Sequence, residues 1–460
     1  MRRDGGLAPR ERGAHLTAPH GTGLERRAQD VLERNRRGAW TCPARDLYPH
    51  QWLWDSCFVA IGLAHDDPER AAGELRALFR GQWSDGMLPH MIFADSSHDA
   101  GSRTIWRSRT RAFAPRDVAT SCITQPPLLA IATSRVADAL PGAQREQLLT
   151  DLVAPLVEYH TWLYAARDLG SGLVTLIHPW ECGLDTTPPW MQELGRMPLP
   201  IWLRVAVRLR LARALRALRY DTRHLPASQR ASDDDGLRML VLAIRAGEHD
   251  FELRRMPRDT SVLVEDLAFN SLLIAANRSL ERIAAEIGSP VGPELQQSFR
   301  RTEAALEALW DEPSGQYYSR NPASGDLIRT PALSTFLPLF ARVPSRERAA
   351  RLVSLLRDPE KYWPAWGVPS VPVDAPGFSE TSYWKGPTWV NTNWLIAEGL
   401  AAYDESQLAA DLRRRTIELV ENAGFWEYFS PLSGAGYGAP DFSWTAALVV
   451  DLLALTTPAP

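Results

Sequence analysis

The sequence predicts an all-α fold, built as a ring of about six helical hairpins. About a dozen segments show the apolar spacing typical of helices, irregular loops separate them, and no strand–helix repeat is present. With 460 residues and 45% hydrophobic content, the chain can bury a large core. We expect a disordered polar tail over residues 1–24 and a single domain over residues 25–460, in which loops at one end of the ring form the pocket.

Helical spacing begins at Leu24, is interrupted by the aromatic stretch 45–58, and resumes to about Ala64, and Pro68 opens the next helix. Residues 95–117 read as a loop over one rim that can cover a pocket, and residues 310–326 as a short hairpin-like segment. The predicted later helices are 128–136, 144–166, 198–218, 236–246, 262–287, 293–310, two segments up to 356, and a terminal helix to 455.

Composition excludes several classes of function. The net charge of −4 is small, lysine occurs only at Lys361 and Lys385, and arginine is spread along the whole chain, which argues against nucleic-acid binding. The four cysteines lack CxxC or zinc-finger spacing, so we predict neither a disulfide framework nor a structural metal. Separately, we expect the protein to require no metal or organic cofactor. The N-terminal residues lack an apolar signal core, and no segment offers about 18 uncharged apolar residues. We therefore expect a cytoplasmic protein without a membrane span, and a homo-oligomer is compatible with the sequence.

The run of three aspartates at 233–235 has two readings. It can represent the metal-binding aspartates of an isoprenoid cyclase, which is another helical barrel. It lies among Ser and Gly without a partner motif, however, and acidic residues are favoured in the first turn of a helix. We interpret this run as a helix start.

The segment 177–190 is the centre of the functional prediction. It sets Glu181 and Asp185 between Trp180 and Trp190 in a frame of proline and glycine, which shapes a loop rather than a helix or strand. Indole rings beside an acid suit a site that stacks a sugar ring and dehydrates a carboxyl group. The alternative is a buried structural turn.

A second polar-aromatic stretch runs from residue 45 to 58. Asp55 follows Trp52 by three residues, so both share a helix face that Tyr48 reaches from the preceding loop. A carboxylate beside indoles suits hydrogen bonding to neighbouring sugar hydroxyls, whereas the alternative is a helix start in which Asp55 interacts with backbone amides. Gln125 begins a helix, where its amide faces a cavity or merely caps, and His90 can be an ordinary loop histidine.

The densest aromatic region spans residues 362–394. Tyr383, Trp384 and Trp389 can form a wall for stacking, although about half of the tryptophans here should be ordinary packing. Further on, Glu427 lies within the aromatic run 425–429. A dehydrated, unpaired carboxylate costs several kcal/mol, so Glu427 must be paired, hydrated or used in chemistry.

Taken together, five motifs resemble glycoside hydrolase family 63, and their order and spacing match as well. They are Trp52-Leu53-Trp54-Asp55-Ser56, Gln125-Pro126-Pro127, Trp180-Glu181-Cys182-Gly183-Leu184-Asp185, Tyr383-Trp384-Lys385-Gly386-Pro387 and the run from Glu427 to Trp444. The resemblance covers nearly everything after residue 24 and is strongest to the short bacterial glucosylglycerate and mannosylglycerate hydrolases, which are single (α/α)6 barrels.

The resemblance implies roles for individual residues. It places the catalytic acid at Asp185 and the base at Glu427, with inversion at an α-glucosidic or α-mannosidic bond. The positions that match sugar-binding residues of the family are Tyr48, Trp52, Trp54, Asp55, Gln125, Gly183, Tyr383 and Trp384.

Some positions depart from the family pattern. Thr186-Thr187 stands where Asn-Ser is usual, and Cys182 where Ser is usual, so specificity is in more doubt than fold. Arg219 and Arg223 lie about where glycerate-specific relatives keep a carboxylate-binding arginine; the alternative is a solvated face. We expect a small glycoside as substrate, carboxylated if such an arginine enters the pocket. A neutral disaccharide such as trehalose, or an inactive sugar-binding barrel, is the alternative.

Overall fold

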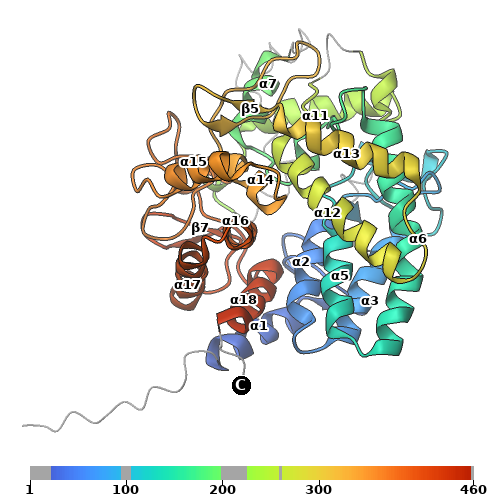
Figure 1. The fold of residues 1–460 in the computed structure, drawn as a ribbon, viewed down its shortest axis with the longest axis horizontal. Coiled ribbons are helices and arrows are strands. Elements are labelled where there is room, and N and C mark those ends of the chain that lie inside the picture. The colour runs from blue at the N-terminus through green and yellow to red at the C-terminus, as the bar shows by residue number, and fades with distance from the viewer. Residues whose placement is uncertain (1–21, 95–104, 198–224, 258–261, 457–460) are drawn as a thin grey trace, which may run out of the picture.

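The fold is known from a computed structural model, which describes residues 22–94, 105–197, 225–257 and 262–456 (Figure 1). The α-helices that lie within the described residues are α1 (Thr22–Arg34), α2 (Leu53–Leu63), α3 (Pro68–Leu78), α5 (Leu129–Ala139), α6 (Gly142–Arg167), α7 (Pro188–Arg196), α11 (Asp233–Glu248), α12 (Leu267–Glu286), α13 (Pro293–Glu307), α14 (Leu337–Phe340), α15 (Arg346–Leu356), α16 (Val390–Ala402), α17 (Ser406–Ala423) and α18 (Ser443–Thr456).

Strands are short in the described part of the chain. Each strand has two residues, and the strands pair antiparallel as β1 with β2, β3 with β4, β5 with β6 and β7 with β8. The bounds are β1 (Arg36–Arg37), β2 (Trp40–Thr41), β3 (Gln51–Trp52), β4 (Met91–Ile92), β5 (Trp310–Asp311), β6 (Gln316–Tyr317), β7 (Tyr428–Phe429) and β8 (Gly436–Tyr437). The all-α prediction and the predicted hairpin at 310–326 are confirmed.

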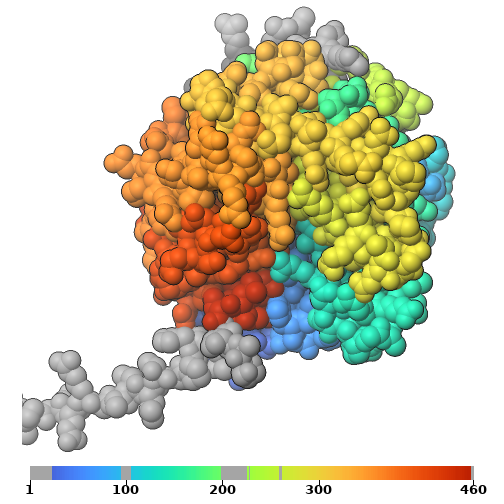
Figure 2. Space-filling model, in the orientation of Figure 1, coloured from blue at the N-terminus to red at the C-terminus, as the bar shows by residue number. Residues whose placement is uncertain are grey.

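Six helices form a closed inner ring. In order of packing they are α2, α5, α12, α14, α16 and α18, and α18 returns to pack on α2. Outer helices pair with them: α3 on α2, α6 on α5, α13 on α12, α17 on α16, and α1 on α18. The first and last helices of the described chain thus lie side by side (Figures 1 and 2). This is the helical barrel that the sequence predicts.

The sequence explains which helices are inside. Every residue of α2 is buried, and α18 is buried from Ser443 to Leu452, because both helices are apolar on all faces. The outer helix α1 instead carries exposed charged residues on one side. The helices with the widest apolar faces therefore lie in the inner ring.

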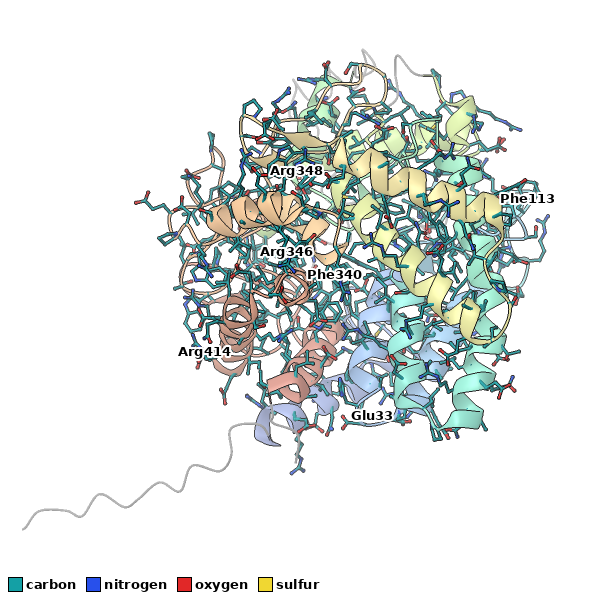
Figure 3. The ribbon with its side chains drawn as sticks, in the orientation of Figure 1. Glu33, Phe113, Phe340, Arg346, Arg348 and Arg414 are labelled. Atoms are coloured by element: carbon teal, nitrogen blue, oxygen red, sulfur yellow. The ribbon has the colours of Figure 1, made fainter. Side chains whose placement is uncertain are left out.

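Surface arginines are mostly paired with acids. Figure 3 labels Arg346, Arg348 and Arg414 on the outer surface, where they pair with Asp404, Glu307 and Glu418 respectively. All four cysteines are free thiols and buried. Within the described ranges, no helix is long and apolar enough to cross a membrane, and no group of three or more His, Cys, Asp or Glu side chains is arranged to hold a metal ion.

The structure shows where α11, α12 and α1 begin, which tests three local predictions. The aspartate run begins α11, where the Ser232 side chain caps by accepting a hydrogen bond from the N–H of Asp235 at 3.1 Å. Helix α12 begins at Leu267 rather than at the predicted Val262, because the preceding residues pair in β-bridges and Asp266 caps the helix. Residues 22–24 belong to α1 and not to a tail. The rest of the predicted tail, residues 95–104, and the predicted helix 198–218 lie outside the described residues.

Candidate active site

The loop that carries Asp185 joins α6 to α7 and is held by Glu181. Glu181 is fully buried and forms an ion pair with Arg167 at 2.9 Å. It also accepts a hydrogen bond from the N–H of Ile177 at 2.7 Å. Removing one partner of such a buried pair leaves an uncompensated charge, so Glu181 serves the loop's structure. Asp185 is the half-buried acid of the loop.

Gly183 allows the Trp54 ring to pack closely against the loop, two residues before Asp185. Its φ of +73° lies in the left-handed region, and a Cβ there would stand 2.7 Å from the Trp54 ring. Trp54 in turn packs edge-on against Trp444, with ring centroids 5.5 Å apart. The contacts of Gly183 and Trp54 thus set the position of the loop.

Asp185 and Thr186 are the two central residues of a β-turn. The turn is closed by a 2.8 Å hydrogen bond from the N–H of Thr187 to the carbonyl of Leu184. Dehydration raises the pKa of Asp185 to about 7; the Arg230 charge opposes this rise and the Glu427 charge adds to it. About half of the Asp185 carboxyl groups are therefore protonated at pH 7, and more of them at lower pH.

Glu427 lies directly before β7 and is surrounded by donors. The Tyr48 hydroxyl donates to Oε1 at 2.9 Å, and the backbone N–H of Ala439 donates to Oε2 at 2.9 Å. The Arg230 guanidinium pairs with Oε2 at 3.2 Å. Glu427 is therefore bound by a hydroxyl, a backbone amide and a guanidinium, which are donors that suit a carboxyl group.

Arg230 was missed by the sequence analysis. Its side chain is only 4% exposed, and its guanidinium lies over the rings of Tyr48 and Tyr383, with centroids at 5.5 and 4.9 Å. Burial works against its charge, but Glu427 and the neighbouring tyrosines raise its pKa well above the usual value. No signal in the sequence marks Arg230, because arginine is frequent everywhere in the chain.

The predicted polar-aromatic group forms around Tyr48. The Trp52 ring packs edge-on against Tyr48 at 5.9 Å, and its buried indole N–H has no hydrogen-bond partner among the described residues. Asp55 is buried on α2; burial, and then the charges of Glu427 and Asp185, raise its pKa well above the usual range. The pKa of Asp55 therefore depends on the charges of both Glu427 and Asp185.

Other predicted residues serve packing in the structure. The Gln125 side-chain oxygen accepts the N–H of Trp54 at 3.3 Å, so Gln125 caps α2. The ring of Trp384 stacks on that of Trp389 at 3.8 Å with 2° between planes, and Trp389 is completely buried. Tyr383 lies beside them with a strained φ of +36°.

His90 also has a structural role. It bonds Ser121 and packs against Trp52, and burial lowers its pKa to about 3. His90 is therefore neutral in ordinary conditions.

Comparison with known proteins identifies the family. Residues 48–445 match the model of the mannosylglycerate hydrolase MGH1-like glycoside hydrolase domain. The chain is 38% identical to the mannosylglycerate hydrolase of Thermus thermophilus, over 92% of this chain and 99% of that protein. The crystal structure of the family 63 mannosylglycerate hydrolase from the same species, in complex with Tris and D-glycerate, superposes with a TM-score of 0.83 over 93% of this chain and 99% of that one, at 37% identity.

The chain belongs to glycoside hydrolase family 63. This confirms the family, the (α/α)6 barrel and the glycoside hydrolase activity that the sequence analysis inferred. The glucosylglycerate hydrolase of Mycolicibacterium hassiacum is 31% identical over 94% of this chain and 98% of that protein. A yeast neutral trehalase, at 16% identity and a TM-score of 0.55, shares the fold alone.

Two residues that depart from the family pattern support the acid's turn. Cys182 accepts the N–H of Leu184 through its sulfur at 3.3 Å, and the Thr186 hydroxyl accepts the N–H of Trp384 at 3.2 Å. Arg219 and Arg223, the predicted carboxylate-binding arginines, lie outside the described residues. The arginine that the structure does place at the site is Arg230.

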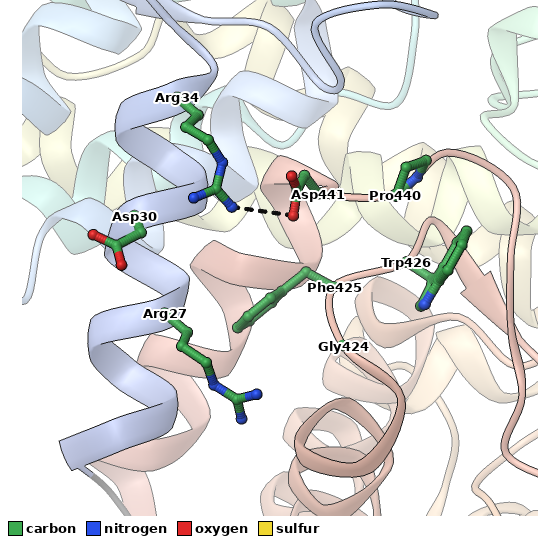
Figure 4. A pocket seen from close by; sticks show the side chains of 8 residues that line it. All are labelled: Arg27, Asp30, Arg34, Gly424, Phe425, Trp426, Pro440 and Asp441. Carbon is green, nitrogen blue, oxygen red and sulfur yellow. Dashed lines mark hydrogen bonds and ion pairs between the residues drawn. The ribbon is translucent and has the colours of Figure 1, made fainter.

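A groove of about 440 Å³ lies elsewhere in this family 63 enzyme (Figure 4). It runs between α1 and the segments 424–426 and 440–441, and Arg34 pairs with Asp441 across it at 3.1 Å. Trp426 lines the groove, whereas the next residue, Glu427, contacts Tyr48 and Arg230. The groove holds neither candidate acid and is not the active site.

Proposed function

We propose that this enzyme hydrolyses the α-glycosidic bond of a small mannoside or glucoside with inversion, with Asp185 as acid and Glu427 as base. The observation that carries the proposal is the contrast between two acids at one site. Dehydration raises the pKa of Asp185 to about 7, whereas Glu427 accepts hydrogen bonds from Tyr48 and the Ala439 backbone and pairs with Arg230. Environments that divide two carboxyl groups in this way define the acid and the base.

The proposed reaction is a single displacement. Asp185 gives its proton to the leaving oxygen as the bond to the anomeric carbon breaks. Glu427 removes a proton from a water molecule, whose oxygen attacks the same carbon from the opposite face. The products are the free sugar of inverted configuration and the released alcohol. The water needs space, so we expect the two carboxyl groups to be about 6.5–9.5 Å apart in the substrate complex.

The sugar has two described partners of suitable chemistry. The indole N–H of Trp52 is buried without a partner, and a buried donor of this kind is expected to be satisfied by a ligand or water. Asp55 lies on the same side, next to the catalytic acids, where its raised pKa lets it donate as well as accept hydrogen bonds to hydroxyl groups.

The leaving group that we propose is a small carboxylic acid alcohol such as glycerate. Arg230 is a buried guanidinium beside Glu427, and guanidinium groups bind carboxylates through two parallel hydrogen bonds. The Arg230 charge also acts on Asp185, the proposed donor to the leaving oxygen, which places the guanidinium near the leaving-group side of the site as well. The similar proteins named mannosylglycerate and glucosylglycerate hydrolases support the same class of substrate.

The test is a substrate panel with the anomer of the product recorded. Mannosylglycerate, glucosylglycerate, trehalose and maltose are incubated with the enzyme, and proton NMR follows the first sugar formed. We expect cleavage of one or both glycerate glycosides and initial release of the β anomer. Arg230→Met should raise KM for these substrates, and Arg230→Lys should restore part of the loss. Cleavage of neutral disaccharides alone would replace the carboxylate proposal with the trehalase-like alternative, and first release of the α anomer would overturn inversion.

We also propose a cytoplasmic location. Four buried thiols, none of them in a disulfide, support a reducing compartment. Fractionation of cells that express the chain without an added tag tests this proposal.

A further inference from the structure

Two β-turns at the active site are joined by a hydrogen bond between their central residues. In the acid turn, Asp185 and Thr186 are the central residues. In the aromatic turn, Tyr383 and Trp384 are central, and the N–H of Lys385 closes it on the carbonyl of Ser382 at 2.8 Å. The Thr186 hydroxyl accepts the N–H of Trp384 at 3.2 Å and so joins the two tips.

The aromatic turn needs this acceptor. In a β-turn the N–H of the third residue is not used by the closing hydrogen bond, so Trp384 must find a partner elsewhere. Its side chain is buried in the stack on Trp389, away from solvent. In addition, Tyr383 has a φ of +36°, a conformation that side-chain-bearing residues keep only when their surroundings enforce it. Thr186 supplies the acceptor and one of the enforcing contacts.

The acid turn is held from both sides of Asp185. The Cys182 sulfur accepts the N–H of Leu184, the residue before the acid, and Thr186 is anchored directly after it. Thr186 is 1% exposed, so its hydroxyl is not exchanging this bond for water. The position of Asp185 along the turn is therefore set by two side chains, Cys182 and Thr186, which stand at two of the three positions where the sequence departs from the family pattern.

We propose that Thr186 is a positioning residue for the proton donor: its hydrogen bond to Trp384 locks the acid turn against the aromatic turn and fixes Asp185 relative to the leaving oxygen. The proposal rests on the proposed role of Asp185 as the acid. It assigns Thr186 no contact with substrate. Loss of the bond should loosen the turn, displace the carboxyl group and admit water to it.

The test compares leaving groups that need a proton with one that does not. Thr186→Val keeps the shape of threonine and removes the acceptor, Thr186→Ser keeps the hydroxyl, and Thr187→Val is the matched control, because the Thr187 side chain makes no capping hydrogen bond. Each is assayed on the glycerate glycoside that the wild type cleaves best and on the α-glycosyl fluoride of the same sugar. Fluoride leaves without protonation by an acid.

The expected result is selective. Thr186→Val should lower kcat on the glycoside by about 10- to 100-fold with KM nearly unchanged, since a displacement of about 1 Å costs up to about 100-fold. Its rate on the fluoride should equal that of the wild type. The alkaline limb of its kcat/KM profile should move to lower pH, because water lowers the pKa of Asp185. Thr186→Ser and Thr187→Val should stay within about threefold of the wild type.

Other outcomes separate this inference from the proposed function. Wild-type rates for Thr186→Val on both substrates, or equal losses on both, would overturn the positioning role.

Asp185→Asn, measured beside it, should lose activity on the glycoside and keep activity on the fluoride. If it does so while Thr186→Val behaves as wild type, the acid assignment holds and the inference fails alone. If Asp185→Asn retains the glycoside, the acid assignment itself fails. Thr186→Ala, which removes the same acceptor without adding a methyl group, takes the place of the valine variant if that variant does not fold.

Discussion

Replacing Asp185 by Asn is expected to stabilise the folded protein at neutral and alkaline pH while abolishing glycoside hydrolysis. The folded-state pKa of Asp185, about 7, lies above the ordinary value of 3.8, mainly because the site dehydrates the carboxyl group. A group with a raised pKa binds more protons in the folded than in the unfolded state. Its contribution is neutral below about pH 4 and turns unfavourable as pH rises toward the folded-state pKa. Asparagine never ionises and avoids this cost.

The size of the effect follows from the shift. From 3.8 to about 7 is about three pKa units, and each unit corresponds to about 1.4 kcal/mol, so ionising Asp185 costs the folded state about 4 kcal/mol. Integrated over pH, Asp185→Asn should exceed the wild type in free energy of unfolding by about 2 kcal/mol at pH 5 and about 4 kcal/mol at pH 8.

Urea unfolding, followed by the fluorescence of the 17 tryptophans, measures this difference at the two pH values. Both proteins share every other titrating group, so the difference between them reports Asp185 together with its charge interaction with Asp55. A gap of equal size at both pH values, or an asparagine variant less stable than the wild type at pH 8, would show that the site does not dehydrate Asp185.

Three further predictions concern the same residues and one distant pair. The kcat/KM of the wild type should fall about tenfold per pH unit above about pH 7, as Asp185 loses its proton; a profile flat to pH 9 would contradict this. Gly183→Ala should lower the free energy of unfolding by about 2–4 kcal/mol, from its positive φ and the clash with Trp54, and a thermal melt equal to the wild type would refute the strain. His65 bonds Asp451 at 2.8 Å, which raises the pKa of His65; its stabilising effect is full below the ordinary pKa and is lost as pH rises through the folded-state value. His65→Gln should therefore destabilise the protein at pH 5.5 but not at pH 9, as thermal melts at both values can check.

The sequence predicted the ring and most of its helices because the apolar spacing is strong and several inner helices, such as α2, α16 and α18, are apolar on nearly all faces. The acids were found for a different reason. A carboxyl group amid aromatic residues, proline and glycine is expensive to bury without a use, and this property marked Glu181, Asp185 and Glu427. Only the family resemblance then chose Asp185 over Glu181. Their proximity could not be predicted, since it depends on how the ring closes.

The polar partners were less predictable than the acids. Arg230 carries no local pattern, and its importance arises only from the burial of its side chain next to Glu427. Trp54 and Gln125 match family positions, yet their contacts in the structure are with Gly183 and with the start of α2. Residue type shows which side chains can bind a sugar, whereas packing decides which of them stay free to do so.

The return of α18 to α1 and α2 has a consequence for the timing of synthesis. Tyr48 and Glu427, which share a hydrogen bond, are separated by 379 positions along the chain, and Asn35 is bonded to Asp441 from a similar distance. On the ribosome, the residues of the first helices are made long before their partners exist. An incomplete chain therefore contains Asp185 but not Glu427. With the roles proposed above for these two acids, a nascent polypeptide cannot hydrolyse a glycoside until its last helices have been made and have packed into the ring.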